Sequence, residues 1–186
     1  MLQKYGLKPG YFLFVGTLQP RKNVEGILAA FQALPEELRR SRGLVIAGKA
    51  GWGADALAAK LHGLRSEGAC HWLQYVPADE LKALYQCAGV FVFPSLWEGF
   101  GIPVLEAFAS GIPVIASNVS SLPEVAGDAA LLVDPQGITE LRNAMERLAQ
   151  DRDFAQTLIE RGRLRARQMT WETCAKKTLE VYRQAL

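Results

Sequence analysis

The chain has 186 residues, of which 49% are hydrophobic and 22% charged, and its formal net charge is +2. This composition is ordinary for a globular protein. The small net charge argues against a strong positive electrostatic field of the kind that binds nucleic acid. No apolar run approaches the roughly 20 residues that a membrane-spanning helix needs. The three cysteines, Cys70, Cys87 and Cys174, are odd in number and lack metal-ligand spacing, so we expect reduced thiols rather than a disulfide framework or a zinc site.

Residues 1–10 are expected to form a linker that enters the domain. Residues 11–15 are continuously apolar, which is typical of a parallel strand buried on both faces. A turn follows at residues 16–23, where Asn23 is placed to cap the helix that begins at Val24. Such a turn lies at the carboxyl edge of an α/β sheet, where ligands bind, so Arg21 and Lys22 are candidates for contacting an anionic ligand. The alternative is that Arg21 and Lys22 are solvated surface residues that bind no ligand.

Five more apolar runs alternate with helical segments, within residues 43–47, 70–76, 89–93, 110–117 and 129–133. This alternation predicts an α/β fold, a doubly wound Rossmann-like domain whose parallel sheet has about six strands in the order 3-2-1-4-5-6. The first strand is not followed by Gly-x-Gly-x-x-Gly, and no Walker A string is present, which argues against hydride transfer with a dinucleotide.

The chain is predicted to be helical from residue 138 onward, and this region carries a basic cluster and an apolar stripe. The basic cluster comprises Arg161, Arg163, Arg165 and Arg167. A solvated surface is its expected role, with attraction to anionic lipid headgroups as the alternative. The apolar stripe on the last helix comprises Trp171, Ala175, Leu179, Tyr182 and Leu186.

The segment that follows the fourth strand, residues 94–108, reads Pro-Ser-Leu-Trp-Glu-Gly-Phe-Gly-Ile-Pro-Val-Leu-Glu-Ala-Phe. Pro103 suits the first position of a helix, which places Glu98 in a loop and Glu106 in the first helical turn. The glycines and the helix start expose N–H groups that attract anions. Two carboxylates beside such groups suit a ligand that carries both hydroxyls and phosphate. The alternative is a surface Glu98 and a Glu106 that only stabilises the helix dipole.

The string from Glu98 to Glu106 resembles the Glu-x7-Glu signature of retaining glycosyltransferases with two Rossmann-like domains, the GT-B architecture. The specific resemblance is to the glycogen synthase-like family, which includes bacterial mannosyltransferases. It implies that Glu98 lies beside the donor sugar as a catalytic residue and that Glu106 binds the ribose hydroxyls. It also implies that four loop N–H groups face the sugar and diphosphate, those of Gly99, Phe100, Gly101 and Ile102.

The first turn resembles the diphosphate-binding turn of the same family, which begins here at Gly16. Lys22 matches the family lysine, whereas Thr17 stands where many members carry arginine, so Arg21 is the candidate for the second cation. The resemblance implies that these cations stabilise the departing nucleoside diphosphate. Two further donor contacts follow from it, Lys49 in the loop at residues 48–53 and Val76 beside the nucleobase.

The resemblance covers residues 11–186 and implies the nucleotide-sugar-binding half of an enzyme whose acceptor-binding domain would precede residue 1. It favours GDP-mannose as the donor, a glycan or lipid-linked acceptor, no cofactor and no metal. It places the protein in the cytoplasm, with glycan assembly and peripheral membrane contact at the inner face of the cell membrane. The isolated chain is expected to bind donor but to transfer little sugar. A sugar-nucleotide epimerase of the same architecture and a non-catalytic nucleotide-binding module are the alternatives.

Overall fold

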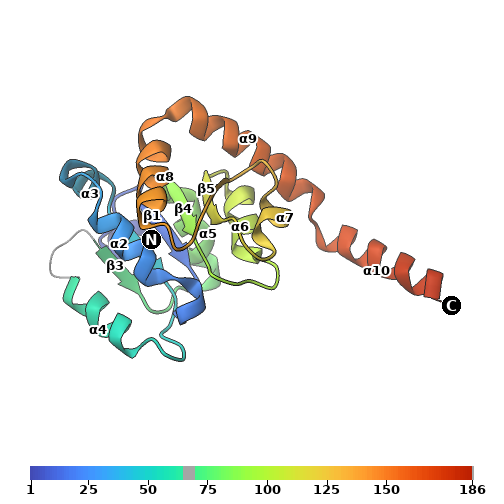
Figure 1. The fold of residues 1–186 in the computed structure, drawn as a ribbon, viewed down its shortest axis with the longest axis horizontal. Helices are drawn as coiled ribbons and strands as arrows, with labels where there is room; N and C mark the ends of the chain where they lie inside the picture. Colours follow the sequence, from blue (N-terminus) through green and yellow to red (C-terminus); the bar gives the residue numbers. More distant parts are fainter. Residues whose placement is uncertain (65–69, 186) are drawn as a thin grey trace.

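The computed structural model describes residues 1–64 and 70–185, and in this part of the chain six parallel strands form one sheet (Figure 1). The strands are β1 (Phe12–Val15), β2 (Leu44–Ala47), β3 (Cys70–Leu73), β4 (Val90–Phe93), β5 (Val114–Ser117) and β6 (Leu131–Val133). Their order is β3-β2-β1-β4-β5-β6, which confirms the predicted order. The chain adds β2 and β3 on one side of β1 and then β4, β5 and β6 on the other side. Such folds bind ligands at this switch point, between β1 and β4.

The four inner strands are apolar because both of their faces are covered by helices. Every residue of β2, β4 and β5 is buried, and β1 is buried except at Val15. The edge strands β3 and β6 are only partly buried. The third strand is shorter than the predicted run to residue 76, because within residues 1–64 and 70–185 it pairs with β2 alone and their ladder ends at the pair Ala47 and Leu73.

The helices pack on both faces of the sheet (Figure 1). Helix α2 packs on α8, and α6 packs on α5 and α9. In the described ranges they are α1 (Leu2–Tyr5), α2 (Val24–Gln32), α3 (Glu36–Arg42), α4 (Asp55–Leu64), α5 (Ala78–Cys87), α6 (Ile102–Ser110), α7 (Leu122–Ala126), α8 (Ile138–Gln150), α9 (Arg152–Gln168) and α10 (Trp171–Ala185), with a short 3-10 turn at Pro20–Lys22.

The first ten residues are attached to the domain rather than forming a free linker. They contain α1, and Leu7 is buried in the core. Tyr5 Oη donates a hydrogen bond to Glu80 Oε2 at 2.6 Å, and Lys4 Nζ lies 2.7 Å from Glu80 Oε1. These contacts tie α1 to the first turn of α5.

Two arginines of the basic cluster on α9 bind backbone carbonyls, whereas the expected exposure is confirmed for Arg161, Arg163 and Arg167. Arg165 donates hydrogen bonds to the carbonyls of Val125, at 3.0 Å, and Glu124. Arg161 donates to the carbonyl of Asp128 at 3.2 Å. These carbonyls belong to the end of α7 and the turn after it, where a helix leaves its last carbonyls unpaired. The arginines therefore fasten α9 to α7.

Helix α10 projects away from the rest of the fold (Figure 1) and buries none of its residues. Trp171, Leu179 and Tyr182 of the predicted apolar stripe are exposed, and Leu186 lies outside the described residues. None of the helices in the described ranges is both long enough and apolar enough to cross a membrane.

Candidate functional site

The turns that follow β1 and β2 lie against each other at the carboxyl edge of the sheet. Leu18 N–H donates to the carbonyl of Lys49 at 2.9 Å, and Gly51 N–H donates to the carbonyl of Leu18 at 2.8 Å. A Cβ atom added to Gly48 would lie only 1.9 Å from the carbonyl oxygen of Gly16, so glycine is required at this crossing. The contact fixes the position of the first turn, which carries Arg21 and Lys22.

Three of the predicted site residues form one cluster between the β1 turn and the loop after β4, in which Lys22 and Glu98 are buried and Arg21 is 42% exposed. Lys22 Nζ lies 2.5 Å from Glu98 Oε1, and Arg21 Nη1 lies 3.1 Å from Glu98 Oε2. The side chains of Lys22 and Glu98 are only 10% and 8% exposed, so Glu98 is not a surface residue. Lys22 Nζ also lies 4.8 Å from the ring centre of Phe93, the last residue of β4. Two cations and one carboxylate leave the cluster with one net positive charge.

The hydroxyls of two serines that the sequence did not indicate as site residues bind the backbone of Glu98. Ser120 Oγ accepts from the N–H of Glu98 at 2.9 Å and donates to its carbonyl at 2.8 Å. Ser121 Oγ donates to the carbonyls of Glu98, at 3.0 Å, and Phe100, at 2.9 Å. The serines follow β5, and the only signal for them in the sequence is that the ends of β4 and β5 meet at the same sheet edge.

Asn23 does not cap α2, which corrects the prediction. Its backbone is left-handed, with φ of 54°, and its side chain makes no capping hydrogen bond. Instead Nδ2 donates to the carbonyls of Pro94, at 3.1 Å, and Pro135, at 2.6 Å. Asn23 therefore joins the segments that follow β1, β4 and β6, and it braces the turn that carries Lys22.

The loop between Glu98 and α6 presents unused N–H groups. Those of Gly99, Phe100, Gly101 and Ile102 donate to no acceptor within the described part of the chain. Gly101 has φ of 109°, which disfavours any side chain, whereas a Cβ added to Gly99 would meet nothing within 4 Å. The open space beside Gly99 and the start of α6 together suit an anionic ligand.

Glu106 lies apart from the cation cluster, in the second turn of α6 rather than the predicted first, because the helix begins at Ile102. Among the described residues its hydrogen-bond donor is Tyr85 of α5, whose Oη lies 2.9 Å from Glu106 Oε2. Tyr85 is buried, at 2% exposure. Burial, followed by the charge of Glu106, raises the pKa of Tyr85, so the phenol stays protonated and donates.

Residues 3–165 match the family model described as glycosyl transferases group 1. The chain belongs to this family. It is 42% identical over 184 residues to the O-antigen chain mannosyltransferase B of Escherichia coli, covering 98% of this chain and 48% of that protein. It is 32% identical over 187 residues to a serotype-specific mannosyltransferase WbdA of Escherichia coli, covering 98% of this chain and 23% of that one.

A solved structure of sucrose-phosphate synthase from Thermosynechococcus elongatus superposes on this glycosyltransferase domain with a TM-score of 0.82 and 30% identity. The match covers 99% of this chain and 48% of that one. The Rossmann-like fold with its GT-B relatives, as predicted, is therefore confirmed. The chain spans about half the length, or less, of the curated relatives named above.

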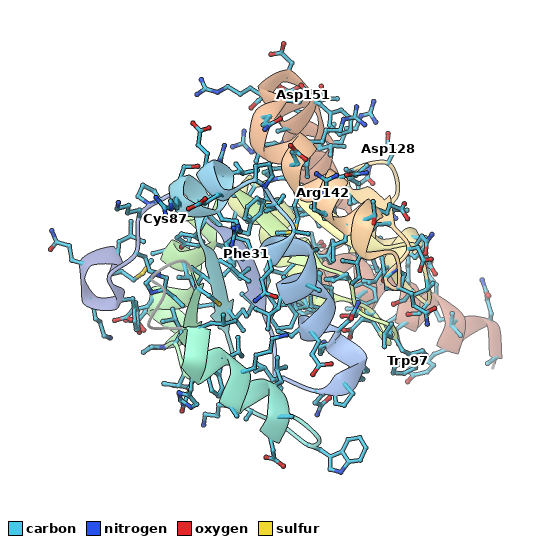
Figure 2. The ribbon with its side chains drawn as sticks, turned by 60° about the vertical axis from the view of Figure 1, so that its left-hand side comes forward. Phe31, Cys87, Trp97, Asp128, Arg142 and Asp151 are labelled. Carbon is cyan, nitrogen blue, oxygen red and sulfur yellow. The ribbon has the colours of Figure 1, made fainter. Side chains whose placement is uncertain are left out.

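The remaining predicted donor residues of this group 1 glycosyltransferase domain lie at the same sheet edge but outside the cluster. Thr17 and Lys49 are exposed, and Val76 is partly buried. Lys49 Nζ lies 5.2 Å from the ring centre of Tyr75, which holds its charge over the segment after β3. Trp97, next to Glu98, is 61% exposed and lies at the periphery of the molecule in Figure 2.

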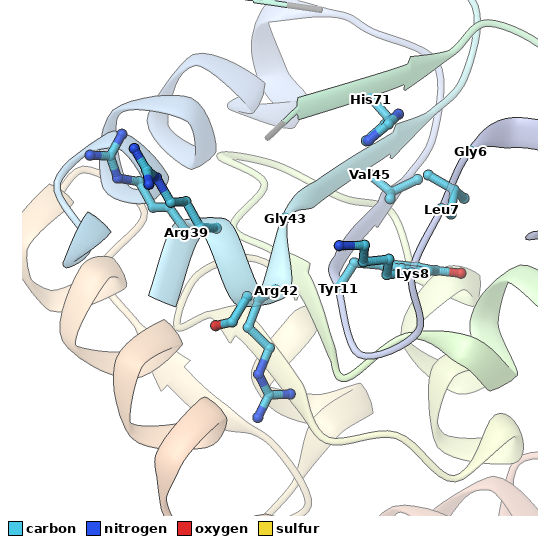
Figure 3. A pocket seen from close by; sticks show the side chains of 11 residues that line it. Gly6, Leu7, Lys8, Tyr11, Arg39, Arg42, Gly43, Val45 and His71 are labelled. Atoms are coloured by element: carbon cyan, nitrogen blue, oxygen red, sulfur yellow. The ribbon is translucent and has the colours of Figure 1, made fainter. Parts of the chain in front are cut away.

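A cavity of about 210 Å³ lies at the opposite, amino edge of the glycosyltransferase domain (Figure 3). Its lining includes Lys8, Gly43 at the start of β2 and His71 at the start of β3. Arg42 beside it donates to the carbonyls of Gly10, at 3.3 Å, and Ala149, at 2.6 Å, and Arg40 pairs with Glu36. Arg42 thus acts within the fold, and none of the predicted site residues lines the cavity.

Proposed function

We propose that this chain is the donor-binding domain of a retaining glycosyltransferase that transfers mannose from GDP-mannose to a glycan or lipid-linked acceptor. The observation that carries the proposal is the buried ion pair of Lys22 with Glu98, joined from the surface by Arg21, beside the four unused N–H groups after β4. The choice of mannose is supported by the mannosyltransferase relatives. Guanine as the base rests on the family resemblance of the first two turns.

The cluster has the charge that a nucleoside diphosphate needs. The nucleoside diphosphate departs from the sugar with about two to three negative charges. Lys22 and Arg21 supply positive charge for it, and the start of α6 supplies N–H donors. Glu98 balances the cations and lies where the sugar would join the diphosphate. Low exposure strengthens these interactions, because buried charges are screened less by water and salt. In this proposal neither a metal nor a cofactor takes part in the transfer.

The proposed transfer breaks the bond between the anomeric carbon of the sugar and the diphosphate oxygen. The acceptor hydroxyl oxygen bonds to the anomeric carbon on the same face, which retains its configuration. The hydroxyl proton passes to the departing diphosphate. Lys22 and Arg21 stabilise the negative charge that develops there, and Glu98 stabilises the positive charge that develops on the sugar. Attack by Glu98 as a covalent nucleophile is the competing route to retention.

The acceptor is assigned to a second domain in this proposal. The match of this chain to about half of its mannosyltransferase relative supports that division. We therefore expect the 186-residue chain to bind donor and to transfer little sugar by itself. Assembly of the glycan in the cytoplasm, at the inner face of the membrane, belongs to the same proposal. On α9, Arg161 and Arg165 bind carbonyls of the fold, whereas Arg163 and Arg167 are exposed and remain open to contact with lipid headgroups.

Calorimetric titration with GDP, UDP and ADP tests the donor site. We expect one nucleotide to bind best, and Lys22→Ala to weaken it by about 1.5–3 kcal/mol, the cost of one charge-assisted hydrogen bond. Glu106→Ala should weaken it as well. Lys60→Ala removes an exposed lysine on α4 and serves as the matched control. Equal affinities of wild type and Lys22→Ala for every nucleotide would rule out the proposed diphosphate site.

A further inference from the structure

Tyr85 is a buried phenol whose hydroxyl donates a hydrogen bond to the exposed Glu106. Its ring packs against Phe91 of β4, with ring centres 5.4 Å apart, and its hydroxyl lies 2.9 Å from Glu106 Oε2. The two residues belong to adjacent helices, α5 and α6. No local pattern in the sequence singles out Tyr85.

The hydrogen bond restricts an otherwise exposed carboxylate. If Glu106 rotated away, the phenol would be left buried without an acceptor, which is costly for a polar group. The bond also occupies only one carboxylate oxygen, since Glu106 Oε1 accepts no hydrogen bond in the described part of the chain. Glu106 is thus held in place with one oxygen still free to accept.

We propose that Tyr85 is a positioning residue, which fixes the Glu106 carboxylate so that its free oxygen binds the ribose hydroxyls of a nucleoside diphosphate. The inference rests on the proposed function, in which Glu106 binds the ribose. A free glutamate loses side-chain freedom when it binds a ligand, and prior ordering by Tyr85 removes part of that cost. Tyr85 therefore acts on ribose recognition without touching the nucleotide.

The test compares two ligands, GDP and 2′,3′-dideoxy-GDP, and two variants, Tyr85→Phe and Glu106→Ala, by calorimetry. The matching pair of uridine nucleotides is titrated in parallel. Phenylalanine keeps the ring on Phe91 and removes only the hydroxyl. We expect Tyr85→Phe to weaken the ribonucleotide by about 3- to 10-fold, the worth of one hydrogen bond, and to leave the dideoxy analogue unchanged. In the Glu106→Ala background Tyr85→Phe should cause no further loss.

Tyr11→Phe is the matched control. Tyr11 is also buried, at 1% exposure, and its hydroxyl donates to the carbonyl of Leu84 in the same helix as Tyr85, at 2.6 Å. Its substitution removes a buried phenol hydrogen bond to α5 without touching Glu106. We expect it to lower the melting temperature but to leave the ratio of the two affinities as in wild type.

The outcomes separate this inference from the function on which it rests. If Glu106→Ala lowers the ratio of ribonucleotide to dideoxy affinity and Tyr85→Phe does not, the positioning role is wrong while the ribose site stands. Equal weakening of both ligands by Tyr85→Phe would show a structural effect and also overturn the inference. If Glu106→Ala leaves the ratio unchanged, or wild type binds no nucleotide, the ribose site itself fails and the inference fails with it.

Discussion

The ion pair between Lys22 and Glu98 joins two residues 76 positions apart in the chain and is almost closed to solvent. Removing one partner of a buried pair leaves the other charge without compensation. We predict that Glu98→Gln destabilises the fold by about 3 kcal/mol, because Lys22 stays buried without its carboxylate. The double variant Lys22→Met, Glu98→Gln should lose less than Glu98→Gln alone. Urea unfolding at pH 7 measures both.

The exposed pair of Arg40 and Glu36 provides the control for this cycle. Its side chains are 78% and 63% exposed, and such pairs contribute little. Glu36→Gln should therefore leave the urea midpoint nearly unchanged. A Glu98→Gln variant as stable as Glu36→Gln would mean that the cluster is solvated in solution.

Buried acids predict a loss of stability at alkaline pH. Burial raises the pKa of Cys70 from 9.0 to about 12, and burial also raises the pKa values of Tyr11 and Tyr85 above 10.0. These groups ionise first in the unfolded chain, so the stability they contribute is complete below about pH 9 and falls as the pH rises toward 12. Urea midpoints between pH 8 and 11 should decrease. Cys70→Val should reduce that slope and Cys174→Ala, at an exposed thiol, should not; a flat profile in wild type would contradict the prediction.

The sequence predicts the role of a site residue well where that role depends on the local segment. It predicts the role less well where it depends on contacts between distant elements. Lys22 and Glu98 were identified because each follows an apolar strand and falls in a stretch that resembles a motif of the glycosyltransferase family. The hydrogen bond of Tyr85 with Glu106 depends on how α5 packs on α6, and no local pattern encodes that distance. Asn23 has the residue type of a helix cap, yet a left-handed backbone and two distant carbonyls use it differently.

Among the elements, α9 lies closest to α6 at a glycine. A Cβ added to Gly162 would lie 2.6 Å from Phe108 Cδ1, and Phe108 is 1% exposed and cannot move aside easily. Alanine is normally the better helix former by about 1 kcal/mol. We predict that Gly162→Ala nevertheless destabilises the fold by about 1–3 kcal/mol, since overpacking a buried contact outweighs propensity. Thermal unfolding measures the difference.

Gly63→Ala is the matched control for the packing of α9. It lies in α4, where an added Cβ meets nothing within 4 Å. The higher helix propensity of alanine should then stabilise the protein by about 0.5–1 kcal/mol. If both substitutions raise the melting temperature, α9 does not pack on α6 as closely as the structure has it.

The strands were the most predictable elements, because an apolar run buried on both faces has few alternatives in an α/β sequence. Their order followed from the family resemblance and the alternation with helices. The end of β3 was placed three residues too late, since the length of an edge strand depends on its one neighbour. The spacing of the arginines on α9 does not indicate which carbonyls a neighbouring helix offers as acceptors. The sequence therefore predicted these side chains on the surface without partners in the fold.

At the scale of the whole molecule, α10 contributes little to the folded core. None of its residues is buried, and it extends beyond the rest of the structure. We predict that ending the chain after Met169 shifts the melting temperature by less than about 3 °C, equivalent to under about 1 kcal/mol for a domain of this size. Ending it after Asp151 should lower the melting temperature much further, because Leu158 and Gly162 of α9 are buried. Similar losses in both truncations would show that α10 packs on the domain.

The place of β1 between β2 and β4 has a consequence for synthesis on the ribosome. Phe12 of β1 pairs with Val90 of β4, so one side of this apolar strand has no partner until 78 more residues have been made. At about 5–20 residues per second that interval is roughly 4–16 s. Throughout it the nascent chain exposes an apolar strand edge, the kind of surface on which chains aggregate. A strand that is almost fully buried in the finished domain is thus exposed along one edge during translation, and chaperones would have to protect it for that time.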